Sequence, residues 1–335
     1  MGYKIAVIPG DGIGPEVTNS AVQVLKALNL DMEFVICEAG LKSWERYGKQ
    51  LTEEMLEVIK RSDACLKGPT QTPEGPESYR SVAVTLRQTL DLYANVRPIK
   101  SRKGVPALHQ NVNFVIVREN TEGLYAGIEE RKGETALAAR VITRRGSERI
   151  ARFAFDLALA EGRKKVTIVH KANILKITCG LFREVCLEVA KGYPSIEVEE
   201  LMVDAAAHRI VRRPQDLDVL VTTNLFGDIL SDEAAGVVGG LGVVPGANIG
   251  ARHAMFEPVH GVALKYAGKG VVNPSAMILS AAMMLKYLGE EKNALKLERA
   301  LEKVLEEGKV VTKDLGGNAS TQAMTEETIR ILETL

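Results

Sequence analysis

The chain has 335 residues, and its 43 basic side chains balance its 43 acidic ones. This length predicts two domains with a sizeable core, and the lack of net charge argues against nucleic acid or an anionic membrane surface as a partner. Hydrophobic residues make up 46% of the chain and aromatic residues only 5%, which is typical of an α/β protein, and the chain contains no run of about 18 apolar residues that would predict a membrane-spanning helix.

Apolar runs and turn residues divide the chain into alternating strands and helices. Strands are expected at 3–8, 32–37, 64–67, 96–100, 114–117, 165–169, 196–203 and 217–222. Helices are expected at 15–28, 52–60, 79–92, 147–161, 176–190, 205–212, 275–288, 291–307 and 320–334. Residues 135–143 are β-prone amid charge and predict a protruding hairpin, whereas six glycines within 235–250 predict a loop-rich segment. The alternation predicts an α/β sandwich.

The N-terminus and the cysteines indicate where the protein works. The first expected strand begins within four residues of the start of the chain, which leaves no signal peptide. The cysteines show neither a CxxC pair nor the spacing of a zinc site, and they are Cys37, Cys65, Cys179 and Cys186. We therefore expect a cytoplasmic protein with reduced thiols, in which Cys179 and Cys186 pack in a core.

Two aspartates, Asp228 and Asp232, lie four residues apart just after the expected strand at 217–222. If Gly227 opens a helix, both carboxylates lie on one helical face, where like charges destabilise the helix by about 0.2–0.5 kcal/mol. A divalent cation would reverse that effect, because Mg²⁺ is held by a few carboxylates together with substrate oxygens. On spacing alone, the alternative has equal weight: Asp228 is favoured by the helix dipole and Asp232 is solvated.

The glycine loop at 10–14 follows a strand and precedes a helix, as a dinucleotide-binding loop does. Its pattern, however, is not G-x-G-x-x-G, and no acid occupies the expected ribose-binding position. The loop is therefore weak evidence for a Rossmann fold, and a tight turn with a helix entry explains it equally well.

Three arginines could recognise a carboxylate ligand. Arg87 and Arg97 lie ten residues apart, and Arg118 ends the apolar strand expected at 114–117. A charge at the end of a buried strand requires a partner, and a guanidinium pairs with a carboxylate through two parallel hydrogen bonds. The cluster therefore suits a polycarboxylate ligand, although a surface or ion-paired arginine is the commoner explanation for each one singly.

Lys171 and Tyr125 are candidates for proton transfer. Lys171 follows the strand expected at 165–169, and ligands gather at the carboxyl ends of strands in open α/β sheets. A lysine there can act as a base when its surroundings favour the neutral amine, and Tyr125 is a possible acid. For each residue alone, a lysine extended over the surface and a packed tyrosine are the simpler explanations.

Seven ordered motifs, spread over essentially the whole chain, resemble the β-decarboxylating dehydrogenases, the family of isocitrate, homoisocitrate and 3-isopropylmalate dehydrogenases. The motifs are 10–16, 86–98, 118–125, 170–173, 224–232, 257–261 and 273–274. The resemblance implies the α/β, two-domain fold of that family, with mixed sheets flanked by helices and not a common Rossmann fold. It also implies oxidative decarboxylation of an (R)-2-hydroxy acid with a carboxylate on C3, with reduction of NAD or NADP.

The resemblance assigns roles to individual residues. It implies that Mg²⁺ or Mn²⁺ is held by Asp228 and Asp232 of one subunit and by Asp204 of its partner. Lys171, also from the partner, would take the hydroxyl proton, and Tyr125 would protonate the enol after CO₂ leaves. The implied substrate-binding residues are Ser81, Arg87, Arg97, Arg118, Tyr125, Lys171 and Asn173.

A cofactor site outside the Rossmann fold is also implied. The expected residues are Lys67, Thr70 and Thr72 on the nicotinamide side, and His260, Gly261, Ala263, Lys265, Tyr266 and Asn273 on the adenosine side. Members that use NAD usually carry an acid where this chain has Lys265, and the Lys265-Tyr266 pair resembles isocitrate dehydrogenases that use NADP. The further tyrosine and arginine of that pattern are replaced by Lys313 and Gly317, which leaves NAD as the alternative to NADP.

Substrate specificity is expected on the helix face just before the arginine cluster. Ser81 matches the serine that meets the third carboxylate in isocitrate dehydrogenases, whereas Ala83 departs from the asparagine often found there. Val84 resembles the apolar lining of isopropylmalate enzymes, and Arg80 could admit an acidic tail. The 118–123 segment resembles homoisocitrate and isocitrate enzymes. We expect homoisocitrate to be the best substrate, with activity on 3-isopropylmalate and isocitrate as well.

The implied architecture has two domains with a cleft that closes on the substrate. Residues 1–98 and about 239–335 would form the large domain on the cofactor side. Residues 99–238 would form the small domain, with the dimer interface and a protruding arm at about 128–145. Because Lys171 and Asp204 would act across the interface, a homodimer or a dimer of dimers is expected.

Three other functions remain as alternatives. A non-catalytic regulatory subunit would usually have lost active residues that are all present here. A metal-dependent dehydrogenase acting on tartrate or malate is a rival with similar chemistry, which the 118–123 and 170–173 segments make less suitable. A plain binding module has no positive feature in the sequence.

Overall fold

The structure is a computed structural model that describes residues 2–75 and 78–335. In this part of the chain, ten strands form one mixed sheet in the order β2-β1-β3-β12-β11-β4-β5-β10-β8-β9. The strands are β1 (Tyr3–Ile8), β2 (Met32–Ile36), β3 (Ala64–Lys67), β4 (Ala94–Lys100), β5 (Asn113–Glu119), β8 (Lys165–His170), β9 (Glu197–Met202), β10 (Val219–Thr222), β11 (Pro245–Ile249) and β12 (Ala254–Pro258).

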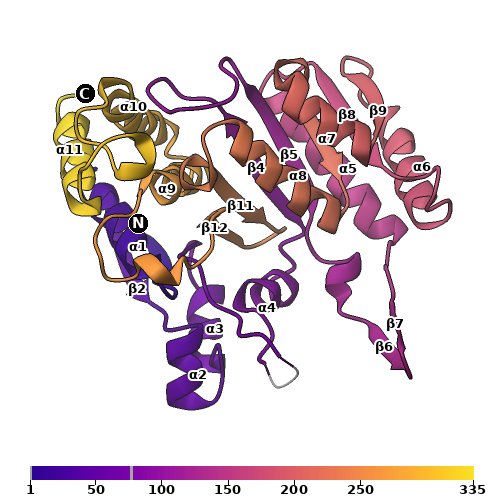
Figure 1. Ribbon diagram of the computed structural model, residues 1–335, viewed down its shortest axis with the longest axis horizontal. Helices are drawn as coiled ribbons and strands as arrows, with labels where there is room; N and C mark the ends of the chain where they lie inside the picture. The colour runs from indigo at the N-terminus through magenta and orange to yellow at the C-terminus, as the bar shows by residue number, and fades with distance from the viewer. Residues whose placement is uncertain (1, 76–77) are drawn as a thin grey trace.

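The helices flank this sheet. They are α1 (Gly14–Lys26), α2 (Leu41–Tyr47), α3 (Glu53–Lys60), α4 (Val82–Thr89), α5 (Arg144–Ala160), α6 (Thr178–Ala190), α7 (Val203–Arg212), α8 (Asn224–Val237), α9 (Ser275–Tyr287), α10 (Glu291–Glu307) and α11 (Thr321–Glu333). Helices α1, α9, α10 and α11 gather with both chain termini at one end of the molecule, and α5 to α8 lie toward the other (Figure 1). Among the described residues, no helix has the length and apolar character needed to cross a bilayer.

The direction of the strands changes in the middle of the sheet. Strands β1, β2, β3 and β12 pair in parallel, as do β5, β10, β8 and β9, whereas β11 and β4 run antiparallel to their neighbours. Parallel strands buried on both faces are near-continuous apolar runs, and Val219–Thr222 of β10 is buried throughout. Hydrogen-bonded pairing makes the sheet continuous from the edge strand β2 to the edge strand β9.

A separate hairpin protrudes from the body of the molecule. Strands β6 (Glu129–Lys132) and β7 (Thr135–Ala138) pair with each other and are exposed throughout. The hairpin extends away from the sheet at the end of the molecule that holds α5 to α8 (Figure 1). It lies within the arm expected at about 128–145, but the hairpin itself was expected at 135–143, and only its second strand falls in that stretch.

Several sequence predictions are wrong in detail. The segment 235–250 is loop-rich only in its middle: residues 238–244 form a turn and the short 3-10 helix η3 (Leu241–Val243), whereas the end of α8 and all of β11 lie on either side. Gly246 lies within β11, because a glycine at a close approach of two backbones is compatible with a strand. Gly227 does not open a helix, since α8 already begins at Asn224. The helix expected at 79–92 is limited to Val82–Thr89, and α2 was not expected.

The predicted boundary between the two domains, at 98/99, falls inside β4. The division of the chain into 1–98 with 239–335 and 99–238 stays a prediction. All four cysteines are free and buried, which agrees with the expectation that Cys179 and Cys186 pack in a core.

Candidate active site

Two arginines of the central strands contact the acidic face of α8. Arg97 lies on β4 and Arg118 on β5, and both are buried. Arg97 Nη1 lies 3.0 Å from Asp232 Oδ1, and its Nη2 lies 3.5 Å from Asp228 Oδ1. Arg118 Nη1 also forms an ion pair with Asp228. The structure therefore brings together two of the arginines and the two aspartates predicted from the sequence.

The local sequence explains how this contact forms. Arg97 and Arg118 are placed by the antiparallel pairing of β4 with β5, in which Asn95 lies opposite Arg118. Helix α8 then crosses close to Arg118 because residue 227 is glycine: a Cβ there would lie 2.6 Å from Arg118 Cβ. Arg118 also donates from Nε and Nη2 to Asn224 Oδ1 at 3.0 and 2.7 Å, which fixes the guanidinium against the first turn of the helix.

The two aspartates differ in their electrostatic surroundings. Burial raises the pKa of Asp228, but the nearby charges of Arg118 and Arg97 outweigh it, so the net pKa is below its usual value. For Asp232, burial raises the pKa more than Arg97 lowers it. Burial lowers the pKa of Arg118 to about 10. This value is still well above 7, so the guanidinium is charged at neutral pH. A cation bound here would replace the arginines as the partner of the aspartates, and an anionic ligand would replace the aspartates as the partner of the arginines.

Tyr125 belongs to the same cluster. It lies on a short 3-10 helix, η1 (Leu124–Ala126), and its hydroxyl donates a hydrogen bond to Asp228 Oδ2. The guanidinium carbon of Arg118 lies 5.0 Å from the centre of its ring. Burial and the hydrogen bond to Asp228 raise the pKa of Tyr125, so the phenol holds its proton and can donate it.

Arg87, Lys67 and Glu257 form a second buried group of charges. Arg87 Nη2 lies 2.9 Å from Glu257 Oε1, and Lys67 Nζ lies 2.8 Å from Glu257 Oε2. Burial would raise the pKa of Glu257, but Lys67 and Arg87 outweigh it and hold the pKa well below its usual value. The structure thus joins a residue expected on the nicotinamide side to one expected on the substrate side. Glu257 was not predicted as a site residue, although its motif was noted.

Lys171 and Asp204 contact each other but stand apart from the α8 aspartates. Lys171 Nζ lies 2.5 Å from Asp204 Oδ1, and Asn173 is exposed on the turn that follows β8. Within residues 2–75 and 78–335, no group of three or more acidic, histidine or cysteine side chains is arranged to hold a metal ion. One chain therefore supplies Asp228 and Asp232 without Asp204. Such a pair fits a cation that also takes oxygens from a substrate.

The segment expected at the adenosine side packs on the glycine loop. The Ile13 N–H donates to the Val262 carbonyl at 3.0 Å, and a Cβ on Gly12, which has φ +59°, would lie 2.1 Å from that oxygen. His260 and Gly261 precede this contact. The glycines of the loop are therefore explained by close backbone packing, and the sequence alternative of a tight turn fits the structure.

The adenosine-side residues lie on two further turns. Ala263 has a left-handed conformation with φ +39° and precedes η4 (Leu264–Tyr266), where Lys265 Nζ lies 4.9 Å from the centre of the Tyr266 ring. Both side chains are exposed. Asn273 Nδ2 donates to Asp314 Oδ2 at 3.0 Å. A positively charged and an aromatic side chain are thus presented together to solvent at the predicted cofactor segment.

On the nicotinamide side, the loop after β3 is held by the glycine loop. The Asp11 N–H donates to the Pro69 carbonyl at 2.8 Å, and Asp11 Oδ2 accepts from the Gln71 N–H at 2.8 Å. Thr70 is half-buried and Thr72 is exposed on this loop. Ser81, the residue before α4, is half-buried and makes no capping hydrogen bond.

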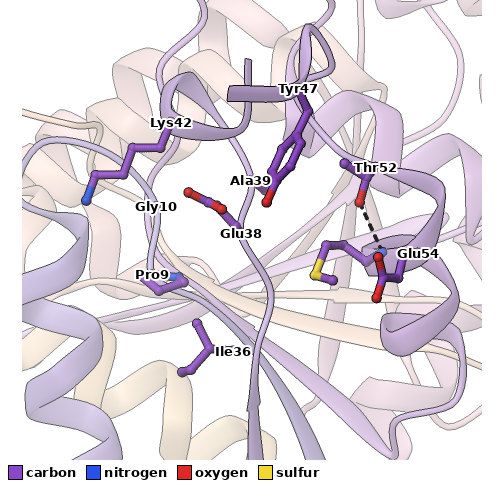
Figure 2. A pocket seen from close by; sticks show the side chains of 10 residues that line it. Pro9, Gly10, Ile36, Glu38, Ala39, Lys42, Tyr47, Thr52 and Glu54 are labelled. Atoms are coloured by element: carbon purple, nitrogen blue, oxygen red, sulfur yellow. Dashed lines mark hydrogen bonds between the residues drawn. The ribbon is translucent and has the colours of Figure 1, made fainter. Parts of the chain in front are cut away.

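A cavity of about 500 Å³ lies between the start of the glycine loop and helices α2 and α3 (Figure 2). It is lined by Pro9, Gly10, Ile36, Glu38, Ala39, Lys42, Tyr47, Thr52, Glu54 and Met55. None of the residues predicted to bind substrate, metal or cofactor lines it. The cavity is therefore separate from the candidate active site.

Comparisons with known proteins agree on one family. A family model described as isocitrate/isopropylmalate dehydrogenase matches residues 4–329. The chain is 52% identical to 3-isopropylmalate dehydrogenase of Archaeoglobus fulgidus over 98% of this chain and 99% of that protein. It is 50% identical to isocitrate/homoisocitrate dehydrogenase of Thermus thermophilus over the full length of both. The crystal structure of isocitrate dehydrogenase from Methylococcus capsulatus superimposes with a TM-score of 0.96 at 50% identity, covering 98% of this chain and 99% of that one.

Proposed function

The chain belongs to the isocitrate/isopropylmalate dehydrogenase family, and within that family we propose that it oxidises and decarboxylates homoisocitrate best. It is a metal-dependent decarboxylating dehydrogenase that acts on a CH–OH group, and its family uses a divalent metal with NAD or NADP. The observation that supports the proposed site is the contact of Arg97 and Arg118 with the acidic face of α8.

We infer that substrate carboxylates replace the aspartates as partners of these arginines. Arg97 and Arg118 are buried and face Asp228, and a carboxylate ligand satisfies a guanidinium as well as an aspartate does. Asp228 and Asp232 would then be free to hold Mg²⁺ or Mn²⁺. The metal, when bound, polarises the carbonyl that forms and stabilises the negative charge of the enolate. Arg87, which lies on α4, would hold a further carboxylate of the substrate.

Two residues would move protons. Lys171 of a second subunit would take the proton of the substrate hydroxyl as hydride leaves for the nicotinamide, which accepts it. Tyr125 would protonate the enol carbon after CO₂ has left. The raised pKa of Tyr125, caused by burial and by Asp228, keeps that proton on the phenol before it is needed.

The choice of substrate rests on the residues around α4. Ser81 and Val84 line the side from which the substrate tail would enter, and Arg80 is exposed beside them, where it could attract an acidic tail. Relatives named 3-isopropylmalate dehydrogenase, isocitrate/homoisocitrate dehydrogenase and homoisocitrate dehydrogenase are 52%, 50% and 46% identical to this chain, so the proposed substrate does not rest on overall similarity. 3-Isopropylmalate and isocitrate are the competing substrates.

For the cofactor, we propose NADP as the preferred nucleotide with NAD as the alternative. Lys265 and Tyr266 are exposed together at the predicted adenosine side, and a cation suits the 2′-phosphate of NADP. His260, Gly261, Ala263 and Asn273 would complete this side. Lys67, Thr70 and Thr72 would face the nicotinamide.

We propose a homodimer, or a dimer of dimers, with shared active sites. Lys171 and Asp204 lie apart from Asp228 in one chain. Apolar side chains next to Lys171 are exposed, with Ile174 at 67% and Ile177 at 86%. An apolar patch beside predicted catalytic residues is what a subunit interface would cover. The division into two domains that close on the substrate is part of the same proposal.

The proposal is tested by measuring kcat/KM for homoisocitrate, 3-isopropylmalate and isocitrate, each with NADP and with NAD in Mg²⁺. Homoisocitrate with NADP is expected to give the highest value. A higher value for either competing acid would refute the substrate assignment and leave the reaction class intact.

A further inference from the structure

Asn248 of β11 is fully buried, and three donors converge on its side-chain oxygen. Oδ1 accepts hydrogen bonds from Arg87 Nε at 3.0 Å, from Asn95 Nδ2 at 2.8 Å and from Asn120 Nδ2 at 2.9 Å. These donors come from α4, from β4 and from the residue after β5. One carbonyl oxygen therefore ties a predicted substrate-binding arginine to the middle of the sheet.

The amide nitrogen of Asn248, in contrast, faces hydrogen-bond acceptors. Nδ2 donates to Glu257 Oε1 at 2.9 Å and to the Met255 carbonyl at 3.3 Å, both on β12. With donors gathered on one side and acceptors on the other, the amide has a single satisfactory orientation. Aspartate lacks the donor for Glu257, and an apolar side chain would lack both functions.

The same network determines which part of Arg87 is available. Its Nε is held by Asn248 and its Nη2 by Glu257, whereas its Nη1 has no hydrogen-bond partner within the described part of the chain. Glu257 in turn receives Lys67 Nζ on its other oxygen. Asn248 therefore contacts both members of the ion pair that links the predicted substrate side to the predicted nicotinamide side.

We propose that Asn248 is a positioning residue that orients the Arg87 guanidinium toward the substrate and holds the Glu257 carboxylate between Arg87 and Lys67. The inference rests on the proposed function, since it takes Arg87 as a substrate-binding residue. Without the amide, Arg87 Nε loses its acceptor and Glu257 loses a donor, and the guanidinium turns to pair with Glu257 through two nitrogens. Arg87 then presents less of its charge to a ligand carboxylate.

The test compares Asn248→Ala with Asn95→Ala. Both changes remove a buried hydrogen bond to the same network, but only the first removes the contacts with Arg87 and Glu257. Hydrogen bonds to charged groups contribute about 1.5–3 kcal/mol, so Asn248→Ala should raise KM for the hydroxy acid by about 10- to 100-fold, with a smaller change in kcat. Asn95→Ala should lower the thermal midpoint and leave KM within about 3-fold of wild type, because an uncharged pair is lost.

A binding readout separates this inference from the proposed function. The increase in thermal midpoint caused by the hydroxy acid with Mg²⁺, without nucleotide, should be lost in Asn248→Ala and kept in Asn95→Ala. A wild-type enzyme that oxidises none of the three acids would refute the proposed function. An active wild type whose KM and ligand-induced stabilisation are unchanged by Asn248→Ala, or changed equally by Asn95→Ala, would refute the inference alone.

Asn248→Asp keeps the volume of the side chain and provides a second test should the alanine variant fail to fold. It places a carboxylate between Arg87 and Glu257, with Lys67 on the far oxygen of Glu257. A protonated carboxyl group restores a donor to Glu257, so the ratio of variant to wild-type kcat/KM should rise as the pH falls. A loss that does not vary with pH would contradict a positioning role.

Discussion

Gly227 of α8 lies directly against the side chain of Arg118, so closely that a Cβ at position 227 would sit 2.6 Å from both Cβ and Cγ of the arginine. This approach brings the acidic face of the helix to the arginines of the sheet. Gly227 therefore helps to form the candidate active site by allowing this close approach, although it carries no functional group.

We predict that Gly227→Ala lowers kcat/KM by about 10- to 100-fold, because a displacement of order 1 Å in a substrate-binding group has effects of that size. Gly236→Ala is the matched control, since it lies on the same helix with no atom within 4 Å of its added Cβ. The control should keep full activity and gain about 0.5–1 kcal/mol in stability. Equal activity in the two variants would show that the contact with Arg118 is unimportant.

Tyr125→Phe should lower kcat by about 10²- to 10⁴-fold, the usual contribution of a general acid, with little change in KM. The phenylalanine keeps the ring that packs against Arg118 but lacks the hydroxyl group that would donate the proton. Steady-state kinetics check this, with Tyr193→Phe as the control, whose hydroxyl donates to Asp156 outside the site. A Tyr125→Phe enzyme with wild-type kcat would remove Tyr125 from the mechanism.

Lys265→Asp should shift the preference from NADP toward NAD, because a carboxylate repels the 2′-phosphate and can accept from ribose hydroxyls. The measurement is the ratio of kcat/KM for NADP to that for NAD. Lys292→Asp, on α10, makes the same change in net charge and should leave the ratio unchanged. An unaltered ratio in Lys265→Asp would contradict the assignment of this position.

The stability of the fold should fall in acid partly through His170. Its Nδ1 accepts the Ala172 N–H at 3.2 Å, and its Nε2 lies 3.2 Å from Glu200, which Arg183 also contacts. Burial lowers the pKa of His170 more than Glu200 raises it. The unfolded chain therefore binds a proton at a higher pH than the folded one, and stability is lost as the pH falls below the ordinary histidine value of about 6.5.

Urea unfolding at pH 7.5 and 5.5 checks this effect. The loss of unfolding free energy on acidification should be smaller in His170→Asn than in wild type, even though the variant is less stable at pH 7.5. The same loss in both proteins would mean that His170 is not one of the groups that cause acid destabilisation.

Shared active sites predict complementation between two inactive variants. Lys171→Ala and Asp228→Asn should each be inactive alone. When their subunits are mixed at random, half of the dimers contain one intact site, so up to about a quarter of the wild-type activity should return. Verified mixed dimers without activity would contradict a site built from two subunits.

Local sequence signals predicted most helices and the parallel strands other than β12, because each is a buried apolar run or a periodic segment bounded by turn residues. They failed at β11, where the glycines suggested a loop. Asn248 is needed there for its two-sided hydrogen bonding, which depends on β12, on β4 and on α4. No pattern within one segment reveals such a contact.

The candidate site shows the same division. The spacing of Asp228 and Asp232 and the positions of Arg97 and Arg118 were apparent from the sequence, and the structure brings these four together. The link from Arg87 through Glu257 to Lys67 joins strands and helices that are far apart in the chain. The sequence also gives no reason for Gly227, because the contact that requires a glycine there is made with Arg118 on a different strand.

The most direct test of the central claim is to follow CO₂ release and nucleotide reduction together, with homoisocitrate as substrate, in Mg²⁺ and then in EDTA. We predict that CO₂ and reduced nucleotide form in equal amounts in Mg²⁺, and that both cease when EDTA removes the metal. Nucleotide reduction without CO₂, or turnover that EDTA leaves unchanged, would contradict a metal-dependent oxidative decarboxylation of this acid.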